Sequence, residues 1–194
     1  MQFSVHSPDV TYEKFMGDYA WRIFATGEID ANADKRLAAL IVDKSIPEDS
    51  RLYFNSPGGS LVGGMALGRV IRANRLHTFI GQFDPNEKYV GFKPGYCYSA
   101  CAIAFLGGEF RYWTDGSVYG VHRFFWKGHS DTDADVAQIM SAAVVEYIRS
   151  MGVDTRIFSL ASEAGASEVV TPSHEMLLML NVVNDGRKPP KWTI

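Results

Sequence analysis

The sequence predicts an α/β fold in which strands and helices alternate along one domain. Short apolar runs of strand length alternate with segments whose apolar residues recur at helical spacing. The length of 194 residues suits one domain with a full core. No internal repeat or low-complexity segment interrupts this alternation. Together these observations predict a single α/β domain.

Composition excludes several classes of protein. Hydrophobic residues make up 46% and charged residues 21% of the chain, which argues against both a disordered and a membrane protein. The net charge of −3 gives no basic excess for binding nucleic acid. No apolar run approaches the ~20 residues that span a bilayer. Residues 1–9 lack the features of a signal peptide. We therefore expect a cytoplasmic protein as the sequence stands, or an exported one if a leader was removed.

The first half of the chain is expected to begin with a polar N-terminal arm at residues 1–19. Alternating strands and helices are expected after it. Strands are expected at residues 21–26, 52–54 and 77–81. A first helix is expected to start from a cap at Asp30 or Asn32, and a second to cover residues 61–73. The second helix carries Gly63, Gly64 and Gly68, each costing ~1 kcal/mol relative to Ala. We therefore expect another element to pack closely against its glycine face.

The second half begins with a loop-like insertion at residues 82–94 and ends in a polar tail at residues 186–194. Between them we expect a buried helix at 100–106, closed by Gly107 and Gly108, and a strand at 117–121. A long helix is expected to begin within residues 131–135 and to end at Gly152. Another helix is expected to start at Pro172, followed by a strand at 181–184. We take residues 20–185 as the domain.

The best candidate for a functional residue is Ser99, directly before the helix at residues 100–106. A Ser at this position is by default a helix cap. Ser99, however, occurs together with the turn Asn-Ser-Pro-Gly-Gly (55–59) and with His122. Taken alone, such a turn only connects a strand to a helix, and a His at a strand end is most often structural. Together, a nucleophile, exposed turn amides and a His are the parts of an acyl-transfer site.

Four blocks of sequence resemble the proteolytic subunit of the Clp protease (ClpP) and its relatives in the crotonase-like superfamily. The first is Arg-Ile-Phe (22–24) with Gly-Glu-Ile-Asp (27–30) and the helix after it, and the second is Leu-Tyr-Phe-Asn-Ser-Pro-Gly-Gly (52–59). The third is Tyr-Ser-Ala-Cys-Ala-Ile-Ala-Phe-Leu-Gly (98–107), and the fourth is Val-His-Arg (121–123), followed by Thr132 and a long helix. The Cys-Tyr-Ser-Ala-Cys form is most similar to a less characterised group of ClpP-like bacterial proteins. The resemblance implies a spiral of β-β-α units with a protruding handle helix.

The same resemblance implies a serine peptidase mechanism. It puts the nucleophile at Ser99, the general base at His122 and the oxyanion-hole amides at Gly59 and Ala100. These residue types suit the chemistry, because backbone N–H groups stabilise a tetrahedral oxyanion and a neutral His can move the Ser proton. Peptide bonds would be hydrolysed through an acyl-enzyme on Ser99.

The resemblance also implies a third catalytic residue, which orients the base, and at this position the sequence departs from the family pattern. The family's Asp position falls on Ser167, and Glu168 stands next to it. Either residue could orient His122, and a backbone carbonyl could do so as well. Loss of the carboxylate can cost ~10⁴-fold in rate. A catalytically impaired ClpP-like scaffold or binding protein is therefore an alternative. A crotonase-type acyl-CoA enzyme is less consistent with the Ser99 and His122 pair.

The resemblance also implies the partners of this chain. These are peptide or unfolded protein substrates and further copies of the chain in a ring-like homo-oligomer, joined through the helix at 136–151. An ATPase partner is not implied, because no unfoldase-contacting segment is recognisable in residues 1–19. No cofactor is expected. A zinc site is not expected either, since two Cys without a nearby His pattern cannot complete it.

The only cysteines, Cys97 and Cys101, flank Ser99. Free Cys residues are commonly small buried hydrophobes. A spacing of four residues at a helix start also allows a disulfide that fixes the turn, or a redox switch on it. The sequence leaves these alternatives open.

Overall fold

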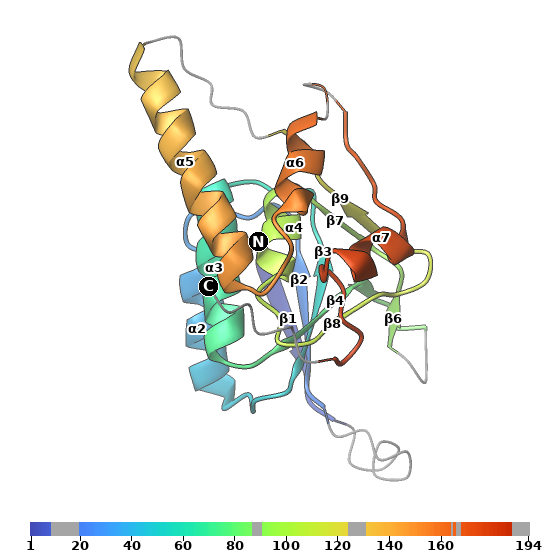
Figure 1. Cartoon of the computed structure of the whole chain (residues 1–194). Helices are drawn as coiled ribbons and strands as arrows, with labels where there is room; N and C mark the ends of the chain where they lie inside the picture. Colours follow the sequence, from blue (N-terminus) through green and yellow to red (C-terminus); the bar gives the residue numbers. More distant parts are fainter. Residues whose placement is uncertain (9–19, 87–90, 124–130, 164, 166–167, 188–194) are drawn as a thin grey trace.

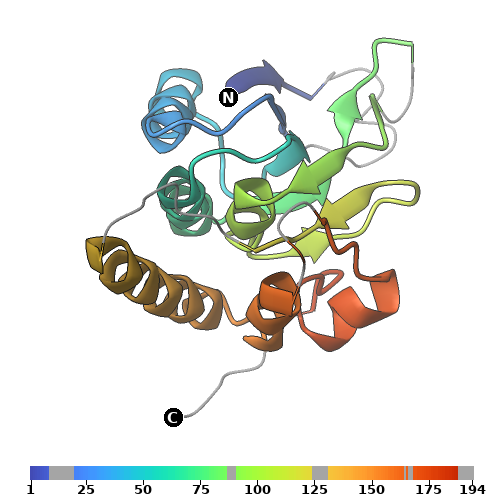
Figure 2. The same cartoon turned by 90° about the horizontal axis from the view of Figure 1, so that it is seen from above.

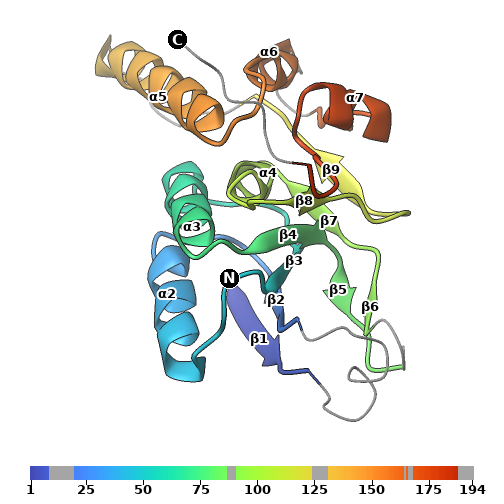
Figure 3. The ribbon, with the colours of Figure 1, turned by 60° about the horizontal axis from the view of Figure 1, so that its bottom comes forward.

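The computed structural model describes residues 1–8, 20–86, 91–123, 131–163, 165 and 168–187, with the backbone alone at 131–134. Its main sheet has the strand order β1-β2-β3-β4-β8. The strands are β1 (Gln2–His6), β2 (Arg22–Thr26), β3 (Arg51–Asn55), β4 (His77–Ile80) and β8 (Arg111–Tyr112). β1 is antiparallel to β2, and the other pairs are parallel. Helices α2 (Ala33–Lys44) and α3 (Leu61–Ala73) cover one face of this sheet (Figures 1 and 3).

A second, two-stranded sheet positions the candidate site. It pairs β7 (Tyr96–Tyr98) with β9 (Val118–Gly120) in parallel. Helix α4 (Ala100–Phe105) starts directly after β7 and Ser99. A short antiparallel hairpin, β5 (Gln82–Phe83) and β6 (Phe92–Lys93), lies within the segment that the sequence predicted as a loop.

The glycine face of α3 packs closely against another element, as the sequence predicted, and that element is chiefly α4. A Cβ added at Gly64 would lie 2.5 Å from the carbonyl oxygen of Ala100, and one at Gly68 would overlap the Tyr147 hydroxyl. The Gly68 backbone also contacts Gly107. Close approach of the two helices therefore requires glycine at these positions.

Two arginines fix the C-terminal end of α4. Arg72 donates to the carbonyl oxygens of Leu106, Gly107 and Gly108. Arg111 is fully buried and donates to Gly108 as well as to two carbonyls of the chain after α7. Burial lowers the pKa of Arg111 to about 9, and the neighbouring charge of Arg72 acts in the same direction.

The remaining helices are α5 (Asp131–Ser150), α6 (Arg156–Glu163) and α7 (His174–Met179). Seen from above, the layers run from β1 and α2 at one end, through α3 and α4, to α5, α6 and α7 at the other (Figure 2). The C-terminal part of α5 is buried at Val144, Tyr147 and Ile148, whereas Ile139 is 67% exposed. The N-terminal part of α5 protrudes from the body (Figure 1), as predicted for the handle helix. No helix within the described residues is long and apolar enough to cross a membrane.

The structure also differs from the sequence predictions near both ends of the chain. Part of the expected N-terminal arm, Gln2–His6, is the edge strand β1, while residues 9–19 lie outside the described residues. An edge strand pairs on one side only and keeps half-exposed side chains, so it lacks a continuous apolar run. Residues 181–184 form no strand, because Asn181, with φ 53°, turns the chain directly after α7 and its C-cap Leu180. Helix α6 was not predicted.

Candidate active site

Ser99 occupies a sharp turn between β7 and α4. Its backbone has φ 58° and ψ −123°, and its side chain makes no capping hydrogen bond to the helix. Ser99 thus stands at the N-cap position without acting as a cap. A non-glycine residue at positive φ costs about 1–3 kcal/mol, which points to a functional constraint. A strained Ser between a strand and a helix is the nucleophile-elbow arrangement that exposes a reactive hydroxyl.

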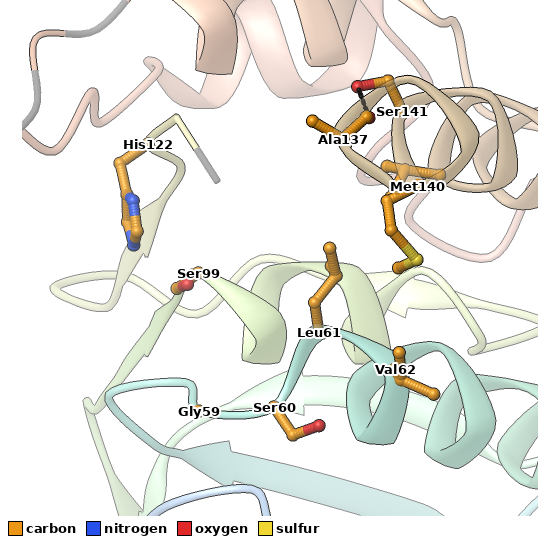
Figure 4. Close-up of a pocket in the computed structure, with 10 residues that line it drawn as sticks. Gly59, Ser60, Leu61, Val62, Ser99, His122, Ala137, Met140 and Ser141 are labelled. Atoms are coloured by element: carbon orange, nitrogen blue, oxygen red, sulfur yellow. Dashed lines mark hydrogen bonds between the residues drawn. The ribbon is translucent and has the colours of Figure 1, made fainter. Parts of the chain in front are cut away.

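His122 reaches the same place through the pairing of β7 with β9. Tyr98 pairs with Gly120, and the Ser99 N–H donates to the Gly120 carbonyl oxygen at 3.0 Å. The two strands are parallel, so the residues that follow them emerge at one edge of the small sheet. Ser99 and His122, 23 residues apart in the sequence, are brought together in this way. The imidazole points toward Ser99 (Figure 4).

The glycine turn after β3 lies against the Ser99 turn. A Cβ at Gly58 would lie 2.6 Å from the Tyr98 carbonyl oxygen and 2.7 Å from the Ser99 Cβ. Gly59 has φ 133°, and its backbone forms a parallel β-bridge with Ile29. The Ile29 N–H donates to the Gly58 carbonyl at 2.7 Å, and the Ser60 N–H donates to the Ile29 carbonyl at 2.8 Å. This turn therefore has a defined position relative to Ser99.

The amides of Gly59 and Ala100 border the site from two different elements. Gly59 precedes α3, and Ala100 is the first residue of α4. Within the described ranges, neither N–H donates a hydrogen bond to another protein group. Gly59 lines the pocket beside Ser99, whereas Ala100 is 1% exposed and is not one of the residues that line it.

A pocket of about 420 Å³ opens beside these groups (Figure 4). Gly59, Ser99 and His122 line its polar side. The rest of its wall comes from the start of α3 and from α5, through Ser60, Leu61, Val62, Ala137, Met140, Ser141 and Val144. The pocket thus combines a polar edge, where the candidate nucleophile lies, with a largely apolar wall.

A backbone carbonyl contacts Nδ1 of His122. Nδ1 lies 2.8 Å from the carbonyl oxygen of Arg123. When Nδ1 carries the proton, it donates to this carbonyl, and Nε2 is then the proton acceptor. The guanidinium of Arg123 donates twice to the Ser162 carbonyl, at 3.0 and 2.9 Å. Sequence reasoning missed Arg123, because every residue has a carbonyl and no side-chain pattern marks the one that is used.

The chain that follows the predicted third-member position pairs with Val121, the residue before His122. Val170 exchanges two backbone hydrogen bonds with Val121, at 2.8 and 2.9 Å. The carboxylate of Glu168, however, accepts a hydrogen bond from the Gly165 N–H at 3.2 Å, and its residue is exposed. Ser167 lies outside the described residues.

Cys97 and Cys101 form a disulfide across the Ser99 turn. Their Cα atoms are 5.2 Å apart, and both residues are fully buried. The alternative that both are free buried thiols was wrong, because the turn at Ser99 brings the strand residue and the first turn of α4 within bonding range.

No model of a known protein family matches the chain, and no curated protein does. Among solved structures, the fold is similar to a mutant of ClpP1 from Listeria monocytogenes. The TM-score is 0.62 with 16% identity, and the match covers 84% of this chain and 88% of that one. At this identity the similarity shows a ClpP-like fold, as the sequence resemblance predicted.

Proposed function

We propose that this chain is a ClpP-like serine endopeptidase that hydrolyses peptide bonds through an acyl-enzyme on Ser99. The observation that carries the proposal is the strained turn at Ser99, which opens into one pocket with His122 and Gly59. Neither the strain nor the shared pocket is needed for a helix cap or a structural His. Both are expected of an activated nucleophile and its base.

In this mechanism the Ser99 hydroxyl attacks the scissile carbonyl carbon while Nε2 of His122 takes its proton. The oxygen of the tetrahedral intermediate accepts hydrogen bonds from the Gly59 and Ala100 amides. His122 then gives the proton to the leaving amine, and water hydrolyses the ester by the reverse route. The Arg123 carbonyl orients the imidazole through Nδ1, at 2.8 Å. Ser167 and Glu168 are the alternative candidates for this orienting role.

The pocket wall supports a peptide substrate with an apolar side chain next to the scissile bond. Leu61, Val62, Met140 and Val144 form the apolar part of this wall. An apolar side chain buried there adds about 25 cal/mol of binding free energy per Å² removed from water. Unfolded protein segments supply such side chains, so they belong to the proposed substrate class.

A ClpP-like scaffold without activity is the second candidate. It is favoured by the Glu168 carboxylate, whose hydrogen bond goes to Gly165 in its own loop. A chain of this kind would keep the pocket for binding but would lack the full activation of Ser99.

A fluorophosphonate probe separates the two candidates, because it reacts covalently with activated serines. The proposal expects labelling of the wild type and none of Ser99→Ala or His122→Ala, with all three folded by circular dichroism. Peptides with an apolar or a charged residue before the scissile bond then test the substrate class. Absence of labelling in a folded, assembled wild type would favour the scaffold.

A further inference from the structure

The disulfide joins Cys97 and Cys101, which lie on either side of Ser99 in the sequence. Cys97 is the middle residue of β7, and Cys101 is the second residue of α4. Ser99 lies two residues from each. The bond therefore joins the strand that enters the turn directly to the helix that leaves it.

The backbone of Ser99 needs such a constraint. A non-glycine residue with φ 58° and ψ −123° persists only where its surroundings determine it. The Ser99 N–H to Gly120 bond fixes the strand side of the turn at 3.0 Å. On the helix side, the Ser99 carbonyl accepts from the Ile103 N–H at 3.3 Å, which is long for a backbone hydrogen bond.

The two ends of α4 are held by different means. At its C-terminal end, Arg72 and Arg111 donate several hydrogen bonds to the last carbonyls. At its N-terminal end, the Ser99 side chain provides no cap, and the disulfide is the covalent link. The Ser99 end of this six-residue helix therefore depends on the disulfide more than the other end does.

Global stability is a weaker explanation for this bond. The entropic stabilisation from a disulfide grows with the length of the loop that it closes, and this loop is among the shortest possible. Its effect is therefore concentrated on the residues inside the loop, and Ser99 is at their centre.

We propose that the Cys97–Cys101 disulfide positions Ser99 for attack, so that the reactivity of the site depends on the thiol redox state of the chain. This inference rests on the proposed function. Reduction by a dithiol such as dithiothreitol transfers two electrons and two protons to give both thiols, and the reagent leaves as its cyclic disulfide. The released turn would relax from positive φ, which moves the Ser99 hydroxyl away from His122 and the Gly59 amide.

The test compares the oxidised wild type, the wild type reduced with dithiothreitol, and Cys97→Ala/Cys101→Ala. Ile41→Ala is the matched control, because it removes a buried side chain from α2, outside the pocket lining. Two measurements are made at a temperature where all forms are folded: the rate of fluorophosphonate labelling, and amide hydrogen exchange in peptides covering residues 96–106. If the double variant does not fold, the reduced wild type decides.

We expect labelling to slow by about 10²-fold on loss of the disulfide, as for a ~1 Å displacement of a reacting group. Exchange at residues 98–103 should rise together with this loss, while Ile41→Ala changes neither. Equal labelling rates with and without the disulfide would overturn the inference and leave the proposed function intact. If no form is labelled, the proposed function fails. Amide exchange then decides separately whether the disulfide positions the Ser99 turn, and an exchange rate that does not change on loss of the disulfide would refute that inference.

Discussion

The carbonyl oxygen of Arg123 lies 2.8 Å from Nδ1 of His122, at the position where a serine peptidase triad usually has a carboxylate. A carbonyl fixes the tautomer of the imidazole, as a carboxylate does, but it adds no negative charge to stabilise the imidazolium. The Arg123 side chain in turn donates two hydrogen bonds to the Ser162 carbonyl at the end of α6.

Arg123→Ala should therefore lower kcat by about 10- to 100-fold with little change in KM, because it misplaces the base without altering the pocket wall. Arg123→Lys should recover part of the loss, since a lysine can donate one of the two hydrogen bonds to Ser162. Peptide hydrolysis at saturating and limiting substrate separates the two constants. A change confined to KM would argue that Arg123 contacts substrate instead.

Glu168→Gln should keep most of the activity. The Glu168 carboxylate accepts from the Gly165 N–H, and a Gln side-chain oxygen can accept the same bond. Ser167→Ala, at the neighbouring position, is the companion variant. Rates of fluorophosphonate labelling provide the measurement. A loss near the ~10⁴-fold effect of neutralising a triad carboxylate would identify Glu168 as the third member.

Gly58→Ala should reduce labelling of Ser99 by about 10²-fold, because the new Cβ would push on the Ser99 turn. Gly27→Ala is its matched control. Gly27 also has positive φ, at 82°, but a Cβ there has no atom within 4 Å. Both variants carry backbone strain, and only Gly58→Ala carries the clash. Equal losses in the two would mean that strain alone accounts for the effect.

Ile139→Glu should weaken self-association, which we propose occurs through the protruding part of α5. Ile139 is 67% exposed on that helix, and a charge at an interface core is strongly unfavourable. Sedimentation velocity over a range of concentrations measures the change in assembly. Val42→Glu on α2, where Val42 is 79% exposed, introduces the same charge elsewhere. Identical sedimentation of wild type and Ile139→Glu would exclude this surface.

Protein stability should fall as pH decreases below the ordinary His range, in part through His77. Burial lowers the pKa of His77, and the attraction of Asp49 only partly opposes this. The folded state thus binds fewer protons at this site than the unfolded state, so its stabilising effect is present above pH ~6.5 and is lost as pH falls through the lowered value. His77→Phe should flatten the dependence of the unfolding free energy on pH from 7 to 5. Chemical denaturation curves that show equal slopes for both proteins would contradict this.

The sequence by itself determined the parts that depend on neighbouring residues. Helical spacing predicted α3 and its bounds, and the three glycines in it predicted that another element packs closely against it. The predicted helix directly after Ser99, together with the glycine turn at 55–59 and His122, singled out Ser99, and a resemblance over four short blocks predicted the ClpP-like fold. Each of these signals arises within a few residues, where side-chain periodicity and glycine content restrict the backbone directly.

Only the tertiary structure decided how these parts combine. The pairing of Tyr98 with Gly120 brings Ser99 to His122, and hydrogen bonds between distant segments set that register. The Arg123 carbonyl at His122, the disulfide at Ser99 and the edge strand β1 likewise had no decisive local signal. The physical reason is that backbone carbonyls and edge amides are the same at every residue. Which of them is used depends on the long-range packing that places them, and not on the side chains beside them in the sequence.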